Sequence, residues 1–411
     1  MSNKKHIVYL GCSGFPYGLA EIQKMTLISR SLVRTGSDVT IICKRGMHKA
    51  SSYPDMKASG NHEGIDYVYT PGSPFYSENF FVRNFLKVKG VINEILLLRK
   101  LKKTNKIDYA ILSTHSFYAI LYYYILSKFC GFKTVLNYVE YYSGVKKKWF
   151  EVDKWINDKL YDRYAPQLVD AVFPISEFLI NDLKKVAPRK KYLKVPVLTD
   201  FERYNGTETL NGQKYFLFCG AANYIEIVKF IIDSYELLGS TAAFLYLVIN
   251  GSEKHIQDIR EYISNTVHKE RIKLLSKLTD KQLNNYYKNA MALLIPLRPT
   301  LQDTARFPHK IGEYLASGSP VVSTNYGEVR YYFKDMENML IADSYDIKLF
   351  AAKMQFVLDN AAEVQRIGMN GRSMALNNFE YKLYGERIVN FLDGLNLNGK
   401  AHTHEVFEKA H

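Results

Sequence analysis

The chain lacks several features that mark common protein classes. It has no run of about 18 or more uncharged apolar residues, so no membrane-spanning helix is expected. It has no zinc-finger spacing, no aromatic RNA-binding motif and no helix-turn-helix signature, so nucleic acid is not an expected partner. Its four cysteines stand singly in or beside apolar runs, without a CxxC pair, and we expect buried thiols rather than a zinc site or disulfides. They are Cys12, Cys43, Cys130 and Cys219.

Two motifs of phosphate chemistry are also absent. No Asp-x-Asp occurs, so no motif supports a metal-bridged diphosphate, and no metal site is expected. The loop from Gly11 to Gly18 is rich in glycine, but its spacing is not GxGxxG, and no acidic residue ends the following strand at Cys43. Its backbone amides can approach an anionic ligand. The alternative is a tight turn that needs glycine for packing alone.

Positive charge is abundant. The 411 residues carry a formal charge of +14, with 47% hydrophobic and 23% charged residues, which is typical of a globular protein with anionic partners. Phosphorylated small molecules and an anionic membrane surface both fit. Basic residues precede the first apolar run, but glycine ends it too soon for a signal peptide. We expect a cytoplasmic protein, with peripheral contact to the inner face of the cell membrane left open.

Apolar strand patterns alternate with helical patterns along the chain, which predicts an α/β fold with two parallel sheets. The first unit joins 6–11, 18–36 and 38–46, and a linker-like stretch lies near 192–206. A second series starts at 214–220. Further strands are expected at 107–114, 133–139, 170–176, 241–251, 271–277, 290–298 and 320–325.

We divide the chain into an N-terminal domain (1–198), a C-terminal domain (199–380), and a closing helix with a tail (381–411). Each of the first two segments is long enough for its own core. Ligands of open parallel sheets bind beyond the carboxyl ends of the strands. Two such sheets that face each other would form a central cleft.

The stretch RFPHKIGEYLASGSPVVST (306–324) carries the strongest binding signal. Pro308 suits a helix start and Gly318 a helix end, so unpaired amides point at the cleft beside Arg306 and Lys310. A diphosphate would meet amide donors and two cations there. Glu313 follows one turn later and can accept ribose hydroxyls. The alternative is an exposed Lys310–Glu313 pair worth about 0.5 kcal/mol.

The segment FPHKIGEYLASGSPVVSTNYGEV resembles the donor site of retaining glycosyltransferases with the GT-B fold, in glycosyltransferase family four (glycosyl transferases group one). SKLTDKQLNNYYKNAMALLIPLR and PVLTDFERY resemble the segments before that site and between the domains. The resemblance implies two Rossmann-like, doubly wound domains around a central cleft, with the acceptor bound mainly by the first and the nucleotide sugar by the second.

The resemblance assigns roles to individual residues. Glu313 matches the glutamate that holds the ribose. The backbone near Lys277 and Leu278 matches the segment that contacts the base. Gly18 matches the glycine whose amide meets the diphosphate from the N-terminal domain.

The chain departs from the family pattern in its charged residues. Ala305 replaces the first glutamate of the usual pair, so we expect the nearby Asp303 to contact the donor sugar. Ala221 stands where an arginine usually follows the strand. We expect Arg306 and Lys310 to supply the missing positive charge, with Arg298 as a more distant candidate.

Two residues that follow strands of the N-terminal domain are candidates for catalysis, beside Lys310. Glu140 stands roughly where the family has a histidine, and it could orient or deprotonate an acceptor hydroxyl. His115 also ends a strand, although a lone histidine is more often structural.

The expected activity is transfer of a sugar, with retention and without a metal, from a UDP- or GDP-linked donor to a hydroxyl of a glycan or lipid-linked acceptor in bacterial surface polysaccharide synthesis. No cofactor is expected. One alternative is a degenerate transferase that serves as a binding or scaffold protein. The other is an epimerase of nucleotide sugars. No motif indicates the oligomeric state.

Two basic, aromatic stretches suggest contact with a membrane. Residues 80–89 are expected to be free to touch lipid. Residues 90–103 are expected to form an amphipathic helix on the sheet with a lysine face in solvent. Residues 140–150 form the second patch, next to Glu140.

Overall fold

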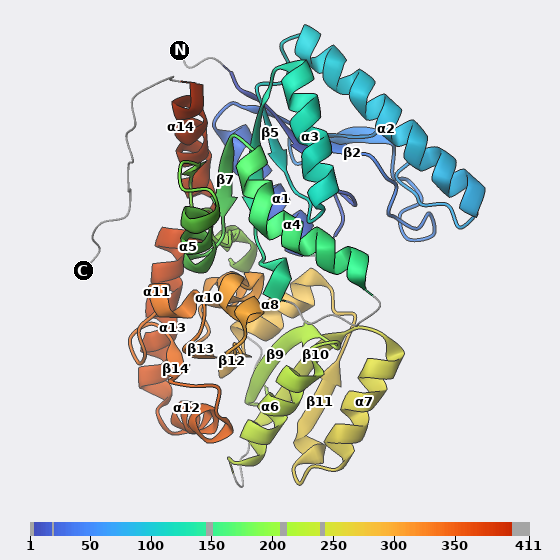
Figure 1. Cartoon of the computed structure of the whole chain (residues 1–411). Helices are drawn as coiled ribbons and strands as arrows, with labels where there is room; N and C mark the ends of the chain where they lie inside the picture. Colours follow the sequence, from blue (N-terminus) through green and yellow to red (C-terminus); the bar gives the residue numbers. More distant parts are fainter. Residues whose placement is uncertain (1–3, 19, 145–150, 206–211, 239–242, 397–411) are drawn as a thin grey trace.

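The computed structural model describes residues 4–18, 20–144, 151–205, 212–238 and 243–396. Figure 1 shows two stacked α/β domains, the N-terminal one above the C-terminal one, each built around a predominantly parallel sheet. This confirms the expected class, a pair of Rossmann-like domains. In the part of the chain that the structure describes, no helix is long and apolar enough to cross a bilayer.

The N-terminal sheet has eight strands in the order β3-β4-β2-β1-β5-β6-β7-β8. All neighbours are parallel except β3 and β4, a hairpin that turns at Gly64, where φ is +82°. Sequence analysis missed this hairpin. The strands are β1 His6–Leu10, β2 Asp38–Cys43, β3 Ser59–His62, β4 Ile65–Tyr69, β5 Tyr109–Leu112, β6 Lys133–Tyr138, β7 Ala171–Pro174 and β8 Lys191–Tyr192.

Helices cover both faces of this sheet. Residues of α2 to α5 share a buried core with Val8 and Leu10 of β1, whereas α1 and the closing helix α14 pack with Ile7 and Tyr9 on the other face. The side chains of β1 thus alternate between two cores, as a doubly wound sheet requires. The helices are α1 Ala20–Arg34, α2 Phe80–Lys103, α3 Phe117–Cys130, α4 Val152–Leu168, α5 Glu177–Val186 and α14 Tyr384–Asn396.

The expectation for residues 90–103 is partly wrong. They belong to the single long helix α2, and it is apolar side chains, Ile92 and Leu96, that face solvent there together with the cations. The inward positions Gly90 and Glu94 are small or polar because backbone and tyrosine hydroxyls approach them closely. Residues 145–150 of the second basic patch lie outside the described residues.

The C-terminal sheet has six parallel strands in the order β11-β10-β9-β12-β13-β14. The predicted strands all occur, with ends shifted by at most a few residues, while β14 and the helices α9, α11, α12 and α13 were not predicted. The strands are β9 Tyr215–Ala221, β10 Phe244–Asn250, β11 Ile272–Leu275, β12 Ala292–Ile295, β13 Val321–Thr324 and β14 Leu340–Ala342. The helices are α6 Ile225–Glu236, α7 Glu253–Ser264, α8 Asp280–Lys288, α9 Leu301–Ala305, α10 His309–Ser317, α11 Val329–Tyr332, α12 Ile347–Asp359 and α13 Ala361–Phe379.

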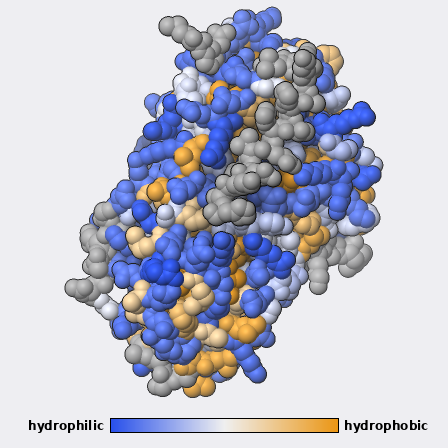
Figure 2. Space-filling model, turned by 90° about the vertical axis from the view of Figure 1, so that its left-hand side faces the viewer, coloured by the Kyte–Doolittle hydropathy of each residue, from blue (hydrophilic) through white to orange (hydrophobic). Residues whose placement is uncertain are grey.

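The chain crosses between the domains twice, and the two crossings lie side by side. The Thr199 amide donates to the carbonyl of Phe379 at 2.8 Å, and the Tyr381 amide donates to the carbonyl of Thr199 at 3.1 Å. After the second crossing, α14 returns to α1 (Figure 1). The Tyr109 hydroxyl on β5 donates a hydrogen bond to the Leu392 carbonyl on α14 at 2.9 Å, which ties the closing helix to the N-terminal sheet. Figure 2 shows the side of the molecule on the left of Figure 1, where the surface is mostly hydrophilic with smaller hydrophobic patches.

A buried ion-pair cluster joins the domains. Glu328, which follows β13, is fully buried and accepts a hydrogen bond from the Glu177 amide at 2.7 Å. Lys194, at the end of the first domain, pairs with Glu328 at 2.6 Å and with Glu177 at 2.8 Å. Next to them, the Ser176 hydroxyl donates to the Ala305 carbonyl at 2.5 Å. The start of α5 is therefore fixed to the C-terminal domain by charge and hydrogen bonds.

We predict that Glu328→Ala lowers the free energy of unfolding by about 3–5 kcal/mol, because the buried Lys194 ammonium loses one of its two carboxylate partners and keeps only Glu177. Urea denaturation followed by circular dichroism measures this. Glu337→Ala is the matched control, since Glu337 pairs with Lys334 at 4.0 Å on the surface; its loss should change stability by no more than about 0.5 kcal/mol. Equal effects of the two substitutions would contradict the prediction.

Candidate active site in the cleft between the domains

The carboxyl ends of both sheets contribute loops to one region. The N-terminal domain supplies the loops after β1, β5 and β6, which carry Gly18, His115 and Glu140. The C-terminal domain supplies the segments after β11 and β12, which carry Lys277 and Arg298. This is the edge at which parallel sheets bind ligands.

The helix α10 presents its N-terminus at this edge. It begins at His309, the start of the helical pattern 309–317 in the sequence, and Pro308 takes the extended N-cap position, with φ −64° and ψ 127°, instead of the first helical position. Pro308 offers no side-chain oxygen to the first turn, so the amides there are available to a ligand. The expected end at Gly318 is confirmed: its φ of +83° is left-handed, which glycine tolerates.

Lys310 and Glu313 form an ion pair on α10. The Lys310 ammonium lies 2.8 Å from the Glu313 carboxylate and donates to the Tyr287 hydroxyl at 3.0 Å. Burial alone would lower the pKa of Lys310, but the carboxylate raises it above its ordinary value. Burial likewise pushes the pKa of Glu313 up, yet Lys310 brings it below its usual range. About a third of the Lys310 side chain stays exposed (32%), so the pair leaves a charged surface for a ligand.

Asp303 lies fully buried between two arginines. Arg298 binds it through Nε at 2.9 Å, Nη2 at 3.2 Å and its backbone amide at 3.0 Å. Arg306 reaches the other oxygen at 2.7 Å. Burial raises the pKa of Asp303, but the guanidinium groups outweigh it and the pKa falls below its ordinary value. Asp303 thus orients both arginines; the contact with a donor sugar stays a prediction.

The Arg306 guanidinium is bound by Asp303 and Tyr224, and its Nε–H remains unpaired. Its Nη1 donates to the Tyr224 hydroxyl at 2.9 Å, and its guanidinium carbon lies 5.1 Å from the centre of that ring. Its Nε–H is buried and has no hydrogen-bond partner. A buried donor without an acceptor costs free energy, so an acceptor supplied by a ligand would be favourable there.

Glu140 approaches this cationic group from the other domain. Burial raises the pKa of Glu140 above its ordinary value, while Arg306 and then His115 act in the opposite direction. The structure therefore brings Glu140 of the N-terminal domain into electrostatic range of Arg306 of the C-terminal domain. His115 is exposed, and its ring lies 5.7 Å from that of Tyr142. The side chain of Asn157 donates to the His115 carbonyl at 3.1 Å.

The other predicted binding residues lie around this centre. Gly18 lies two residues before Ala20, where α1 starts, and a Cβ on Gly18 would come within 2.4 Å of the Ile22 side chain. Lys277 adopts a left-handed backbone with φ +55°, and its amide donates to the Asn250 side chain at 3.2 Å. Leu278, half-buried, follows it at the end of β11. The backbone at 277 and 278 thus lies at the carboxyl edge, where the resemblance puts the base.

Sequence analysis missed Lys24. This lysine on α1 is almost completely buried, and its ammonium donates a hydrogen bond to the Val195 carbonyl at 3.0 Å. Lys24 is close enough to α10 to influence His309 electrostatically. The pKa of His309 is lowered to about 4, first by burial and second by the positive charge of Lys24. One signal in the sequence could have revealed it: Lys24 stands among the residues of α1 that face the core. A lysine is rarely buried in such a position without a partner for its charge.

The cluster alternates cations and carboxylates. Arg298, Arg306 and Lys310 contribute three positive charges, and their partners Asp303, Glu313 and the more exposed Glu226, which lies 3.7 Å from Arg298, contribute three negative ones. Among the residues with described positions, no group of three or more His, Cys, Asp or Glu side chains is arranged to hold a metal ion.

The C-terminal domain matches a known protein family. Residues 201–374 match the family model for glycosyl transferases group 1. The protein is a glycosyltransferase with a group 1 domain. The matched segment contains the cationic cluster, Glu313 and the backbone at 277 and 278.

Solved structures with the same fold cover almost the whole of this glycosyltransferase. Sucrose-phosphate synthase from Thermosynechococcus elongatus has a TM-score of 0.76 at 13% identity, covering 96% of this chain and all of that one. A glycosyltransferase from Rickettsia africae ESF-5 has a TM-score of 0.71 at 14% identity, with 97% and 100% covered. HepE from Anabaena, in complex with UDP and glucose, has a TM-score of 0.67 at 14% identity, with 95% and 99% covered. These confirm the GT-B fold. No curated protein matches the sequence significantly.

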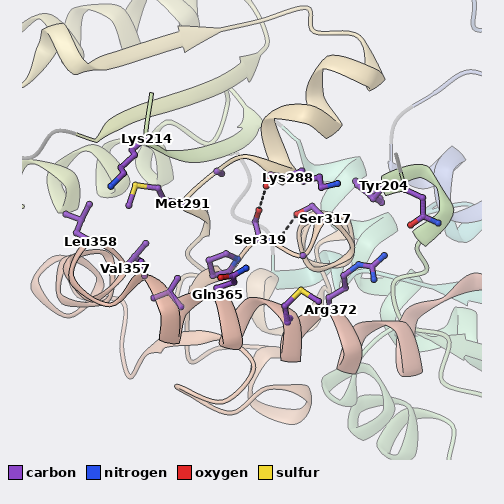
Figure 3. Close-up of a pocket in the computed structure, with 17 residues that line it drawn as sticks. Tyr204, Lys214, Lys288, Met291, Ser317, Ser319, Val357, Leu358, Gln365 and Arg372 are labelled. Atoms are coloured by element: carbon purple, nitrogen blue, oxygen red, sulfur yellow. Dashed lines mark hydrogen bonds between the residues drawn. The ribbon is translucent and has the colours of Figure 1, made fainter. Parts of the chain in front are cut away.

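A cavity of about 640 Å³ lies elsewhere in the glycosyltransferase, at the amino edge of the C-terminal sheet. Figure 3 shows Lys214 and Met291, which precede β9 and β12, together with Ser319 and Arg372 around it. Ser319 donates to the carbonyls of Tyr287 and Lys288 there. Because the cavity lies beyond the last turn of α10 rather than the first, it does not belong to the predicted donor site.

We predict that Lys24→Met stabilises the glycosyltransferase at pH 7 by on the order of 3 kcal/mol, since it removes a charge that burial disfavours. Burial lowers the pKa of Lys24 from 10.5 to about 7. Between those values the unfolded chain binds more protons, so wild-type stability rises with pH from this group. The advantage of Lys24→Met should therefore shrink as pH rises from 7 to about 10.

Urea titrations of both proteins across that pH range measure the difference. Lys254→Met, on the exposed side of α7, is the control and should show no such trend. A constant difference between wild type and Lys24→Met at all pH values would contradict the prediction.

Proposed function

We propose that this glycosyltransferase moves a sugar, with retention of anomeric configuration, from a nucleotide diphosphate donor to a hydroxyl of a glycan or lipid-linked acceptor in bacterial surface polysaccharide synthesis. The observation that carries the donor part is the convergence at the start of α10. Uncapped amides, the Arg306 guanidinium with its unpaired Nε–H, and the Lys310 ammonium all lie there. A diphosphate group can accept hydrogen bonds from all three.

The same groups explain how the leaving diphosphate would be stabilised. Negative charge grows on its oxygens as the bond to the sugar breaks, and fixed donors in a partly buried site stabilise that charge without reorganising. Asp303 keeps Arg298 and Arg306 in place before the donor arrives. We propose that these cations replace a metal ion, consistent with the lack of an Asp-x-Asp motif.

Glu313 and Glu140 would act at opposite ends of the donor. Glu313 would accept the ribose hydroxyls, which requires it to share Lys310 with the diphosphate. Glu140 would orient the acceptor hydroxyl or take its proton, and the rise in its pKa on burial favours a group that can exchange protons. His115 is the second candidate on that side.

The donor is proposed to be UDP-linked, with GDP as the alternative. The similar structure of HepE from Anabaena contains UDP and glucose in one crystal and UDP-glucose in another, which supports uridine as the first base to test.

We expect Lys310→Ala to lower kcat for donor hydrolysis about 100-fold while the fold survives, because it removes charge that stabilises the leaving group. Glu313→Ala should chiefly raise KM for the donor. Arg366→Ala and Glu363→Ala are matched controls, since they break another pair three residues apart on a helix, α13, away from the cleft. Near-wild-type kinetics in both cleft variants would refute the assignment.

A panel of UDP-, GDP- and ADP-sugars separates the candidate activities. Release of free nucleotide, unaffected by EDTA, is expected for the transferase, and proton NMR of the product should show the donor's anomeric configuration. Interconversion of the donor sugar without nucleotide release would indicate an epimerase. A donor that neither reacts nor shifts the melting temperature would indicate a scaffold.

A further inference from the structure

The helix α2 is apolar on the side that faces water. Phe81, Phe85, Val88, Ile92 and Leu96 follow one another at intervals of three or four residues, so they form one stripe along the helix. Each is more than half exposed, and Phe81 reaches 80%. The start of the helix is capped, because the Asn79 side chain accepts hydrogen bonds from the backbone amides of Phe81 and Val82.

The inward side of α2 is already occupied by the core of the domain. Leu98 is fully buried there, and Ile95, Leu97 and Leu101 pack against the same core. Glu94, also fully buried, accepts hydrogen bonds from the hydroxyls of Tyr122 and Tyr123, both at 3.0 Å. A surface helix normally exposes a polar side. The apolar stripe on the outer side of α2 is therefore additional to the side chains that the helix packs against the core.

Two neighbouring helices extend this surface. The helix α3 contacts α2 and α4 along its sides, and Figure 1 shows all three on the same side of the N-terminal sheet. Tyr118, Leu121, Ile125 and Phe129 form an exposed stripe on α3, where Phe129 is 79% exposed. Trp155 and Ile156 are exposed apolar side chains near the start of α4. Large exposed apolar side chains gathered on adjacent helices mark a binding face.

The charges around α2 identify the partner's chemistry. The helix contains seven Lys or Arg residues and a single carboxylate, the buried Glu94. Lys87 and Lys89 flank the apolar stripe near its start and are exposed. A partner must therefore offer both an apolar layer and negative charge, which is what the interface of a bilayer with anionic headgroups provides.

We propose that the outer surface of α2, α3 and α4 docks this glycosyltransferase on an anionic lipid bilayer. The surface leads to the cleft, because α3 starts two residues after His115. Docking would therefore place the acceptor side of the site next to the headgroups, where a lipid-linked hydroxyl is presented. This last step rests on the proposed function, whereas the docking itself does not.

The test is co-sedimentation of the full chain with vesicles of phosphatidylcholine alone, or of phosphatidylcholine mixed with phosphatidylglycerol. We expect binding to the mixed vesicles that weakens as salt is raised. The double variant Phe81→Ser/Phe85→Ser should bind at least about tenfold more weakly. Lys87→Glu/Lys89→Glu should lose the preference for phosphatidylglycerol. The matched control is Val267→Ser/Met369→Ser, which removes two similarly exposed apolar side chains from the C-terminal domain.

Three results would overturn the inference. The first is no binding to anionic vesicles at low salt. The second is equal binding by wild type and both α2 variants. The third is light scattering that shows a wild-type dimer lost in Phe81→Ser/Phe85→Ser, which would assign the surface to a second copy. Donor hydrolysis is measured on the same proteins without vesicles. Vesicle binding without nucleotide release would contradict only the proposed function. Nucleotide release without vesicle binding would contradict only this inference.

Discussion

The fully buried carboxylate of Asp303 is the interaction on which the site depends. It holds Arg298 and Arg306 by charge-assisted hydrogen bonds, which are stronger than neutral ones and fix orientation. The short helix that carries it, α9, also meets the other domain, through the hydrogen bond from Ser176 to the Ala305 carbonyl. One buried anion therefore positions the cations and lies two residues from a hydrogen bond between the domains.

This arrangement gives a physical meaning to the departures from the family pattern. With Ala221 after β9, the loop there brings no guanidinium, and the positive charge comes from the segment between β12 and α10 instead. Ala305 leaves no carboxylate that could compete for Arg306 from that position, and Asp303 takes this place two residues earlier. The cations of the cluster thus stand at other positions in the sequence than in the family pattern.

The sequence allowed the two sheets and the start of α10 to be predicted because long apolar strands and the Pro308–Gly318 pair are local signals. It did not reveal the β3–β4 hairpin, whose first strand, Ser59–His62, is mostly exposed and has no apolar alternation. The partners of Arg306 also escaped prediction, since Tyr224 is 82 residues away in the chain. Lys24 and Glu328 were missed for the same reason: burial of a charge is decided by tertiary contacts, which no local pattern encodes.

The pairing of Thr199 with the segment at 379–381 restricts how the enzyme can move. Two adjacent tethers act as a fulcrum, so the domains can rotate about one line but can hardly slide past each other. Groups near the fulcrum travel least during such a rotation. Lys24 is bonded to Val195, four residues before Thr199, so in such a rotation its ammonium would move less than groups farther from the tethers.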